Sequence, residues 1–236
     1  YTPENAGPRV MPIVQSTTFR YDTTKDIPDL FDLKTANYFY TRLGNPTCGH
    51  VEEKIAALEG GVGAMLTSSG QAATLTSVLT IAKAGDRILC SASVYGGTFN
   101  LMAVTFKRMG IEVDFFEQSE SDEEIAKRIY PNTKAIFGET IANPALTVFD
   151  ISRFAALAHK HEIPLIIDNT FATPVLCKPF DFGADIVVHS TTKFLDGHAV
   201  QVGGVVVDSG KFDWAKSSKF PEFTTPDDSY HGLIYT

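Results

Sequence analysis

The sequence lacks the features that mark membrane-spanning, secreted or nucleic-acid-binding proteins. It has no apolar run as long as a bilayer span and no N-terminal signal-peptide pattern. Its formal net charge is −8, and the basic residues form no cluster. We therefore expect neither a membrane nor a nucleic acid among its partners.

Cysteine is also scarce: only Cys48, Cys90 and Cys177 are present, far apart in the chain. An odd number of widely spaced cysteines does not fit a disulfide scaffold or a zinc site, and it favours reduced thiols in a cytoplasmic protein. We expect each thiol to fill a small space in the core or a pocket. The chain opens without methionine and stops in an apolar stretch, so we expect that both ends are cut.

The usual short motifs for metals and nucleotides are absent as well. His189, His198 and Asp168 are conceivable metal ligands, with His50 more distant, but no histidine pair has helical spacing and no further cysteine or carboxylate completes a set. We therefore predict no metal site. His189 alternates with apolar residues and is more simply a core histidine that supports the site. The stretch 68–71 matches neither the Rossmann nor the P-loop spacing.

What is present is a regular alternation of helices and short apolar strands, which begins after an irregular arm at residues 1–46. Hydrophobic residues make up 44% of the chain, enough for one large core, and no repeat or long linker interrupts it. Continuously apolar strands separated by helices predict an α/β domain with a mainly parallel sheet covered on both faces. The expected helices are 48–59, 68–81, 121–130 and 151–161. The expected strands are 64–67, 87–90, 113–116, 135–138, 164–168, 185–188 and 204–207.

Polar side chains follow most of these strands, where ligands bind in sheets of this type. Because the carboxyl ends of parallel strands share one edge of the sheet, we expect these side chains to converge on one crevice. They are Ser69 and Gly70, 95–98, Glu139 and Asn143, Asp168, and 190–193.

Two of the groups suggest a chemistry. Asp168 ends a buried strand, so its carboxylate needs a cation or several donors, and it is either a structural partner or the partner of a protonated ring nitrogen. Lys193 follows the next clear strand, and an amine at such a crevice can form a covalent bond to a cofactor. Together they fit a pyridoxal phosphate site, in which Tyr95 either stacks on the ring or merely packs.

A phosphate could be held nearby. Ser69 and Gly70 open a helix directly after a strand, where backbone N–H groups and the helix dipole favour an anion. Ser190 and Thr192 could add hydroxyl donors. An ordinary helix N-cap explains Ser69 equally well.

Six motifs then occur in an order typical of a known family. They are Tyr-Thr-Arg-Leu-Gly-Asn-Pro-Thr (40–47), Ser-Ser-Gly-Gln (68–71), Tyr-Gly-Gly-Thr (95–98), Glu-Thr-Ile-Ala-Asn-Pro (139–144), Asp-Asn-Thr-Phe (168–171) and His-Ser-Thr-Thr-Lys-Phe (189–194). With them the chain resembles the Cys/Met-metabolism family of pyridoxal-phosphate enzymes over nearly its whole length. The resemblance implies an aspartate-aminotransferase-like fold (PLP fold type I). Residues 47–236 would form the large cofactor-binding domain, and the smaller C-terminal domain would lie largely outside this chain.

The resemblance also implies roles for individual residues. Lys193 would bind the cofactor covalently and move protons at the substrate's α, β and γ positions, Asp168 would pair with the pyridine nitrogen, and Tyr95 would stack on the ring. These three are the expected catalytic residues. The expected cofactor-binding residues are Tyr40, Arg42, Ser69, Gly70, Gln71, Tyr95, Glu139, Asn143, Asp168, Ser190, Thr192 and Lys193.

In the family, residues like Tyr40 and Arg42 reach a phosphate in the neighbouring subunit. The resemblance therefore implies that the arm, residues 1–46, completes a partner's site, and that the protein is a homo-oligomer, a dimer of active dimers. The arginine for the substrate carboxylate would lie in the C-terminal domain, beyond residue 236.

Three features favour the branch that acts on O-acetylhomoserine with sulfide or a small thiol. Gly97 stands where methionine γ-lyases typically have cysteine, 203–214 is similar to the sulfhydrylase continuation, and 226–233 resembles an insertion that shorter members usually lack. Residues 199–202 depart from the family's small or hydroxylated pattern. The expected reaction is γ-replacement giving homocysteine or methionine plus acetate. Methionine γ-lyase or cystathionine γ-synthase-type activity stays an alternative, as does a non-catalytic anion-binding or regulatory fragment.

Overall fold

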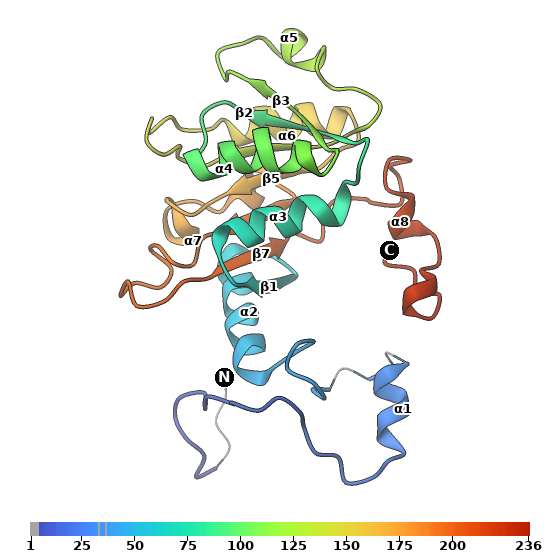
Figure 1. Cartoon of the computed structure of the whole chain (residues 1–236). Coiled ribbons are helices and arrows are strands. Elements are labelled where there is room, and N and C mark those ends of the chain that lie inside the picture. The colour runs from blue at the N-terminus through green and yellow to red at the C-terminus, as the bar shows by residue number, and fades with distance from the viewer. Residues whose placement is uncertain (1–4, 33, 36) are drawn as a thin grey trace.

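The structure, a computed structural model, describes residues 5–32, 34–35 and 37–236. Residues 1–4, 33 and 36 belong to the predicted arm and lie outside the described residues. One seven-stranded sheet runs through the centre of the molecule (Figure 1). Its strands are β1 (Gly63–Thr67), β2 (Arg87–Ser91), β3 (Glu112–Phe116), β4 (Thr133–Glu139), β5 (Leu165–Asp168), β6 (Ile186–His189) and β7 (Gly204–Asp208).

The strand order is β1-β7-β6-β5-β4-β2-β3. The five strands from β6 to β3 are parallel, whereas β7 is antiparallel to both of its neighbours. All seven predicted strands are present, each within two residues of its expected bounds, and the mainly parallel sheet is confirmed. Glu139 and Asp168 are register partners across β4 and β5. Two acidic residues therefore lie side by side at the carboxyl ends of neighbouring strands.

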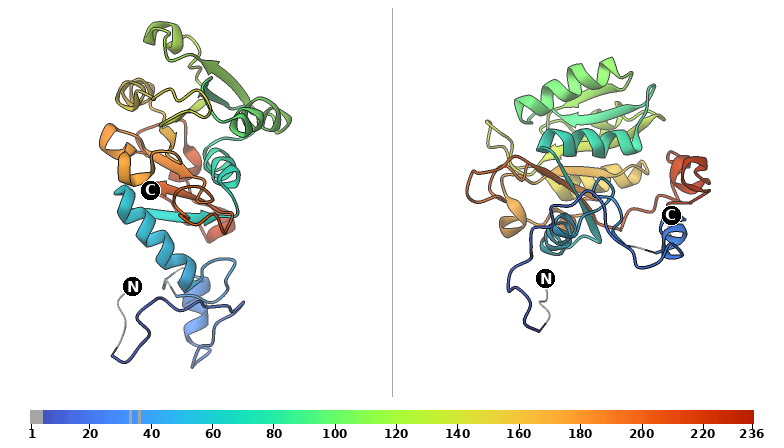
Figure 2. Two further views of the ribbon diagram at one scale, coloured as in Figure 1. Left: turned by 90° about the vertical axis from the view of Figure 1, so that its left-hand side faces the viewer. Right: turned by 60° about the horizontal axis from the view of Figure 1, so that its bottom comes forward.

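Helices cover both faces of the sheet. The helices of the described residues are α1 (Asp26–Phe31), which lies in the arm, α2 (Pro46–Glu59), α3 (Gly70–Ile81), α4 (Gly96–Asn100), α5 (Asp122–Ala126), α6 (Ile151–Lys160), α7 (Thr173–Leu176) and α8 (Pro221–Thr224), with the π-helix η1 (Leu101–Phe106) and the 3-10 turns η2 (Pro179–Phe182) and η3 (Asp228–Tyr230). One core cluster packs α2 and α6 against the sheet, and a second packs α3 and η1 against the other face. Figure 2 shows the sheet between these two layers. No helix in the described part of the chain is long and apolar enough to cross a membrane.

Local capping explains where α2 and α3 begin. Asn45 accepts a hydrogen bond from Thr47 N at the start of α2, and Ser69 accepts one from Ala72 N at the start of α3. Helix α2 ends at Gly60, whose φ of 82° is strained for other residues.

Some expectations were wrong in detail. The arm is irregular, as predicted, but it contains the short helix α1, and it extends away from the sheet in Figure 1. The expected helix at 121–130 is only Asp122–Ala126, and the helical stretch from Gly96 to Phe106 was not expected. Cys90 is buried, but Cys48 is exposed and fills no core space.

The core under α6 gives a first prediction. Phe154 is fully buried, and its ring centroid lies 4.5 Å from that of Phe149 and 4.8 Å from that of Phe116. Phe154→Ala should lower the free energy of unfolding by about 3–5 kcal/mol, because it removes these contacts and leaves a cavity. The control Phe182→Ala, at a ring that is 51% exposed, should stay within about 0.5 kcal/mol of wild type. Urea unfolding of both variants measures the difference, and equal losses would contradict the prediction.

Candidate active site

A cavity of about 290 Å³ opens at the carboxyl ends of the parallel strands. It lies beside the N-terminus of α3, where the sequence predicts ligand binding. Ten of the twelve predicted cofactor-binding residues line it. The lining residues are Ser69, Gly70, Gln71, Tyr95, Glu139, Ile141, Asn143, Asp168, Thr170, Phe171, Ser190, Thr192, Lys193 and Val202.

The N-terminus of α3 forms one wall. The first N–H groups of a helix have no intrahelical acceptor, so those of Gly70 and Gln71 are suited to an anion. Gly70 lets the helix approach the loop after β6: a Cβ on Gly70 would lie 2.5 Å from Ser190 Cβ, closer than real contacts allow. A side chain at residue 70 would push these two walls apart.

Asp168 reaches the floor of the cavity from the end of β5. Its Oδ1 accepts hydrogen bonds from Thr170 N at 3.0 Å and from Thr170 Oγ1 at 2.5 Å. Burial raises the pKa of the Asp168 carboxyl, and the two bonds from Thr170 oppose that rise. A carboxyl of this kind favours a positively charged partner in the cavity. Thr170 was not predicted, although its position two residues after an aspartate is typical of such a turn.

Glu139 joins two loops that border the cavity. Its Oε1 accepts a hydrogen bond from Tyr95 N at 2.7 Å, and its Oε2 accepts one from Asn143 N at 3.4 Å. Burial and the nearby Asp168 carboxylate raise the pKa of Glu139 from 4.5 to about 8. The two hydrogen bonds make this carboxyl an acceptor for the backbone around Tyr95, whose half-exposed ring borders the cavity.

This raised pKa gives a second prediction, for the apo protein. The folded state keeps the Glu139 proton to higher pH than the unfolded chain does, so the associated stability is complete below about pH 4.5 and is lost as the pH rises to about 8. The free energy of unfolding should therefore decline with pH in this window, and Glu139→Gln should make the decline less steep. One titrating group contributes at most about 1.4 kcal/mol per pH unit to that slope. Urea unfolding at several pH values in this window tests it.

The exposed Glu123→Gln serves as the control and should keep the wild-type decline. Asp168 and Asp185, whose pKa values are also raised by burial, contribute a decline of the same sign in every variant. Parallel curves for wild type and Glu139→Gln would contradict the assignment.

Lys193 lies in a short turn after β6. The backbone N–H of Lys193 donates to Ser190 O at 3.2 Å, so the turn brings the lysine and Ser190 to the same cavity. Thr192 Oγ1 is held by Gly203, accepting from its N at 3.0 Å and donating to its O at 3.1 Å. Phe171 and Val202 add apolar surface around the lysine and were not predicted as site residues, although Val202 belongs to the departing stretch 199–202.

Tyr40 and Arg42 are not part of this cavity. They line a separate hollow on the arm, beside 229–231, and both are exposed. The Arg42 guanidinium carbon lies 5.2 Å from the Tyr40 ring centroid. Within one chain, the two arm residues and the other ten predicted residues therefore form separate groups.

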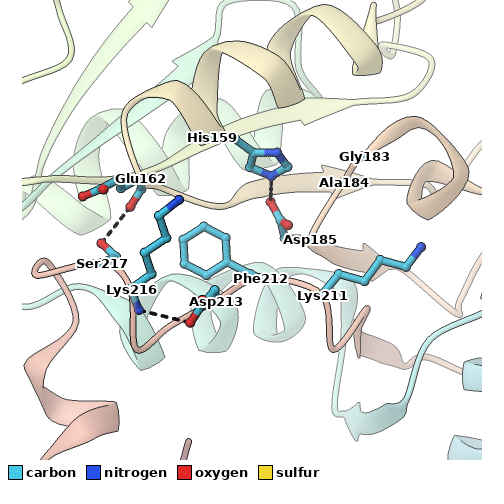
Figure 3. Close-up of a pocket in the computed structure, with 10 residues that line it drawn as sticks. All are labelled: His159, Glu162, Gly183, Ala184, Asp185, Lys211, Phe212, Asp213, Lys216 and Ser217. Carbon is cyan, nitrogen blue, oxygen red and sulfur yellow. Dashed lines mark hydrogen bonds and ion pairs between the residues drawn. The ribbon is translucent and has the colours of Figure 1, made fainter.

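A second cavity of about 200 Å³ lies at the opposite edge of the sheet, beside the amino end of β6 (Figure 3). Its polar groups bond to one another: His159 Nε2 lies 2.8 Å from Asp185 Oδ2, and Ser217 Oγ donates to Glu162 O at 2.8 Å. None of the predicted site residues lines it. We therefore place the candidate active site at the carboxyl edge.

His189 was considered as a metal ligand and, more simply, as a core histidine. His189 is fully buried, as predicted for a core histidine, and bonds to Glu59. Within residues 5–32, 34–35 and 37–236, no group of three or more His, Cys, Asp and Glu side chains could hold a metal ion.

Sequence comparison agrees with this geometry. Residues 2–231 match the family model described as Cys/Met metabolism PLP-dependent enzyme. The chain is 49% identical over 231 residues to the O-acetyl-L-homoserine sulfhydrylase of Corynebacterium glutamicum, covering 96% of this chain and 53% of that protein. It is 45% identical over 236 residues to the homocysteine/cysteine synthase of Kluyveromyces lactis, covering 99% and 53%.

Structural comparison points the same way. A crystal structure of an O-acetylhomoserine (thiol)-lyase from Campylobacter jejuni, with a pyridoxyl-lysine monophosphate in its chain, superposes with a TM-score of 0.95 at 34% identity. The match covers 100% of this chain and 57% of that one. Cystathionine γ-lyase from Lactobacillus plantarum gives a TM-score of 0.77 at 39% identity, covering 86% and 51%. The chain thus spans about half the length of the relatives it matches.

Proposed function

Because the chain belongs to the Cys/Met metabolism PLP-dependent enzyme family, we propose that the whole protein catalyses γ-replacement on O-acetyl-L-homoserine, using sulfide or a small thiol. The products are homocysteine or methionine, with acetate. The observation that carries the proposal is a single cavity that holds Lys193, Asp168 and the N-terminus of α3 together. The name of the Corynebacterium glutamicum relative supports the choice of substrate, and that of the Kluyveromyces lactis relative supports homocysteine as a product.

The residues present fit pyridoxal phosphate, the cofactor of this family. The opening of α3 offers N–H groups to a phosphate, and Gly70 leaves room for Ser190 beside them. Asp168 supplies the anionic partner that a protonated ring nitrogen needs, and Lys193 supplies the amine. Asn143 and Tyr95 complete the set on the loops that Glu139 holds.

When bound, pyridoxal phosphate withdraws electrons from the α carbon of the amino-acid substrate. The chain's own residues would do the rest. Asp168 would hold a proton on the ring nitrogen, and Lys193 would take and return protons at the α, β and γ carbons while acetate leaves and the thiol adds. Ser190, with the helix N-terminus, would orient the cofactor through its phosphate.

The deciding experiment supplies the full-length enzyme with O-acetylhomoserine and sulfide in one reaction and with methionine alone in another. We expect homocysteine to form faster than 2-oxobutyrate. A higher rate of 2-oxobutyrate formation from methionine would instead assign a γ-lyase. A preparation without a visible cofactor band would indicate a non-catalytic anion-binding protein.

We further propose that the site is shared between subunits of a cytoplasmic homo-oligomer, a dimer of active dimers. Arg42 suits a phosphate because its planar fork gives two parallel hydrogen bonds, and here it lies exposed on the arm, apart from its own chain's cavity. The domain division proposed is an arm at 1–46 and a cofactor-binding domain from 47. The three free thiols are consistent with a reducing compartment.

Subunit mixing gives a third prediction. Arg42→Ala and Lys193→Ala proteins should each be nearly inactive, yet a mixed dimer places an intact arm beside an intact lysine in one of its two sites. Random co-refolding should therefore restore about a quarter of the wild-type sites. The measurement is specific activity after refolding at equal ratio, with each variant refolded alone as the control. Mixed dimers without activity would rule out action of Arg42 in the neighbouring subunit.

A further inference from the structure

Behind the cavity, Glu59 forms a buried hydrogen-bonded triad with His189 and Asn169. Glu59 is the last residue of α2. All three residues of the triad are fully buried. Glu59 Oε1 lies 2.5 Å from His189 Nε2 and accepts a bond from Asn169 Nδ2 at 3.0 Å. One carboxylate oxygen therefore joins the ends of two neighbouring strands.

Each partner of Glu59 is adjacent in sequence to a residue of the candidate active site. Asn169 follows Asp168 at the end of β5, and His189 precedes Ser190 at the end of β6. A backbone shift at Asn169 moves Asp168, and a shift at His189 moves Ser190. Because the triad joins Asn169 and His189, it fixes how far Asp168 lies from the turn that carries Lys193.

The network also reaches the third strand end. Thr140 Oγ1 donates to Asn169 Oδ1 at 2.8 Å, and Thr140 follows Glu139 on β4. Asn169 N donates to Val188 O at 2.9 Å, which locks β5 to β6 at the same level. Three neighbouring strands are thus tied together immediately beside the residues that face the cavity.

The polar atoms of the triad are unfavourable to bury in a core. Among the described residues, neither Glu59 Oε2 nor His189 Nδ1 has a hydrogen-bond partner, although both atoms are buried. Burying such atoms costs free energy, and apolar residues of similar volume often replace a buried ion pair without loss of stability. Packing alone therefore does not explain the pair.

The triad also interacts electrostatically with the candidate site. The groups around His189 are Glu59 from α2 and Asp168 from β5, and Cys177, after α7, lies near Glu59. Burial raises the pKa of the Asp168 carboxyl, while the two bonds from Thr170 and, to a smaller extent, the charge interaction with His189 lower it. Glu59 Oε1 lies at hydrogen-bond distance from the same His189 ring.

We propose that Glu59, His189 and Asn169 are positioning residues for the cofactor: they hold Asp168 at a set distance from Lys193. This inference rests on the proposed cofactor site. It assigns a function to side chains that do not touch the cavity and that the sequence motifs do not single out as a group.

The test compares Glu59→Gln with the matched variant Glu52→Gln in the full-length holoenzyme. Both changes lie on α2 and remove one carboxylate, but Glu52 bonds to Leu66 N rather than to the two strand ends. We expect Glu59→Gln to raise the dissociation constant for pyridoxal phosphate about tenfold or more. We also expect the pH midpoint of the cofactor's visible band to shift by at least about half a unit, because a fixed charge near Asp168 is lost.

A double variant, Glu59→Gln with His189→Gln, guards against misfolding, since two amides keep a hydrogen bond and leave no unpaired charge. It should show the same shift in midpoint with near-wild-type urea unfolding. A change in unfolding alone, with cofactor affinity and midpoint equal to those of Glu52→Gln, would make the triad merely structural and overturn the proposal. Failure of the wild-type protein to bind the cofactor would instead refute the proposed function.

Discussion

Replacing Lys193 by alanine is expected to lower the turnover of the full-length enzyme by at least about a thousand-fold, since one side chain supplies both the covalent link and the proton transfers. Lys193 lies in the same cavity as Asp168 and the N-terminus of α3. The variant should therefore still bind pyridoxal phosphate through its other contacts, but reversibly. Borohydride should fix the cofactor to the peptide that contains Lys193 in the wild-type protein and should fix none in the variant.

Lys178→Ala is the matched control, because this lysine is exposed and lines neither cavity described above. It should keep both activity and borohydride labelling. Labelling of another lysine in the wild-type protein, or full turnover by Lys193→Ala, would show that a different amine performs the chemistry.

The second large effect is expected for Asp168→Asn. The amide keeps the size of the carboxyl and can still accept both hydrogen bonds from Thr170, so the change removes only the negative charge. A neutral group cannot stabilise a protonated ring nitrogen, and the loss of one well-placed electrostatic contact typically costs about a hundred- to thousand-fold in turnover. We expect kcat to fall by this factor, with a weaker effect on cofactor binding.

Steady-state kinetics and cofactor titration separate these two effects. Asp181→Asn, at an exposed aspartate, should behave like wild type. A large loss of cofactor affinity with unchanged kcat in the saturated Asp168→Asn enzyme would mean that Asp168 serves binding alone.

Much of the fold could be predicted because apolar strands are local signals. Each strand of the sheet is a short apolar run, and its place follows from composition within a few residues. The direction of β7 does not follow in this way, since an apolar run reads the same in a parallel and an antiparallel strand. The helical stretch 96–106 was missed because Gly96 and Gly97 open it, and glycine is typical of turns rather than helix starts.

The candidate site was predictable only where its residues form continuous motifs. Asp168 ends a strand, and Lys193 and the stretch 68–71 each follow one, so topology brings them together. The bond between Glu59 and His189 joins residues that are 130 positions apart, and Glu59 belongs to none of the six motifs. Nothing local in the sequence indicates that contact, because it depends on how α2 packs across the ends of β5 and β6.

The position of β1 at the edge of the described sheet bears on the order in which a nascent chain can fold. Strand β1 leads directly into Ser69 and Gly70, yet it pairs with β7 alone, from Gly63 opposite Asp208 to Thr67 opposite Gly204. During synthesis, β1 therefore has no strand to pair with until residues 204–208 have emerged. Pairings between such distant residues form slowly. The start of α3, which forms one wall of the cavity, follows β1, so this wall is fixed to the sheet only after β7 has formed. A chain interrupted before residue 204 exposes an unpaired apolar strand to aggregation.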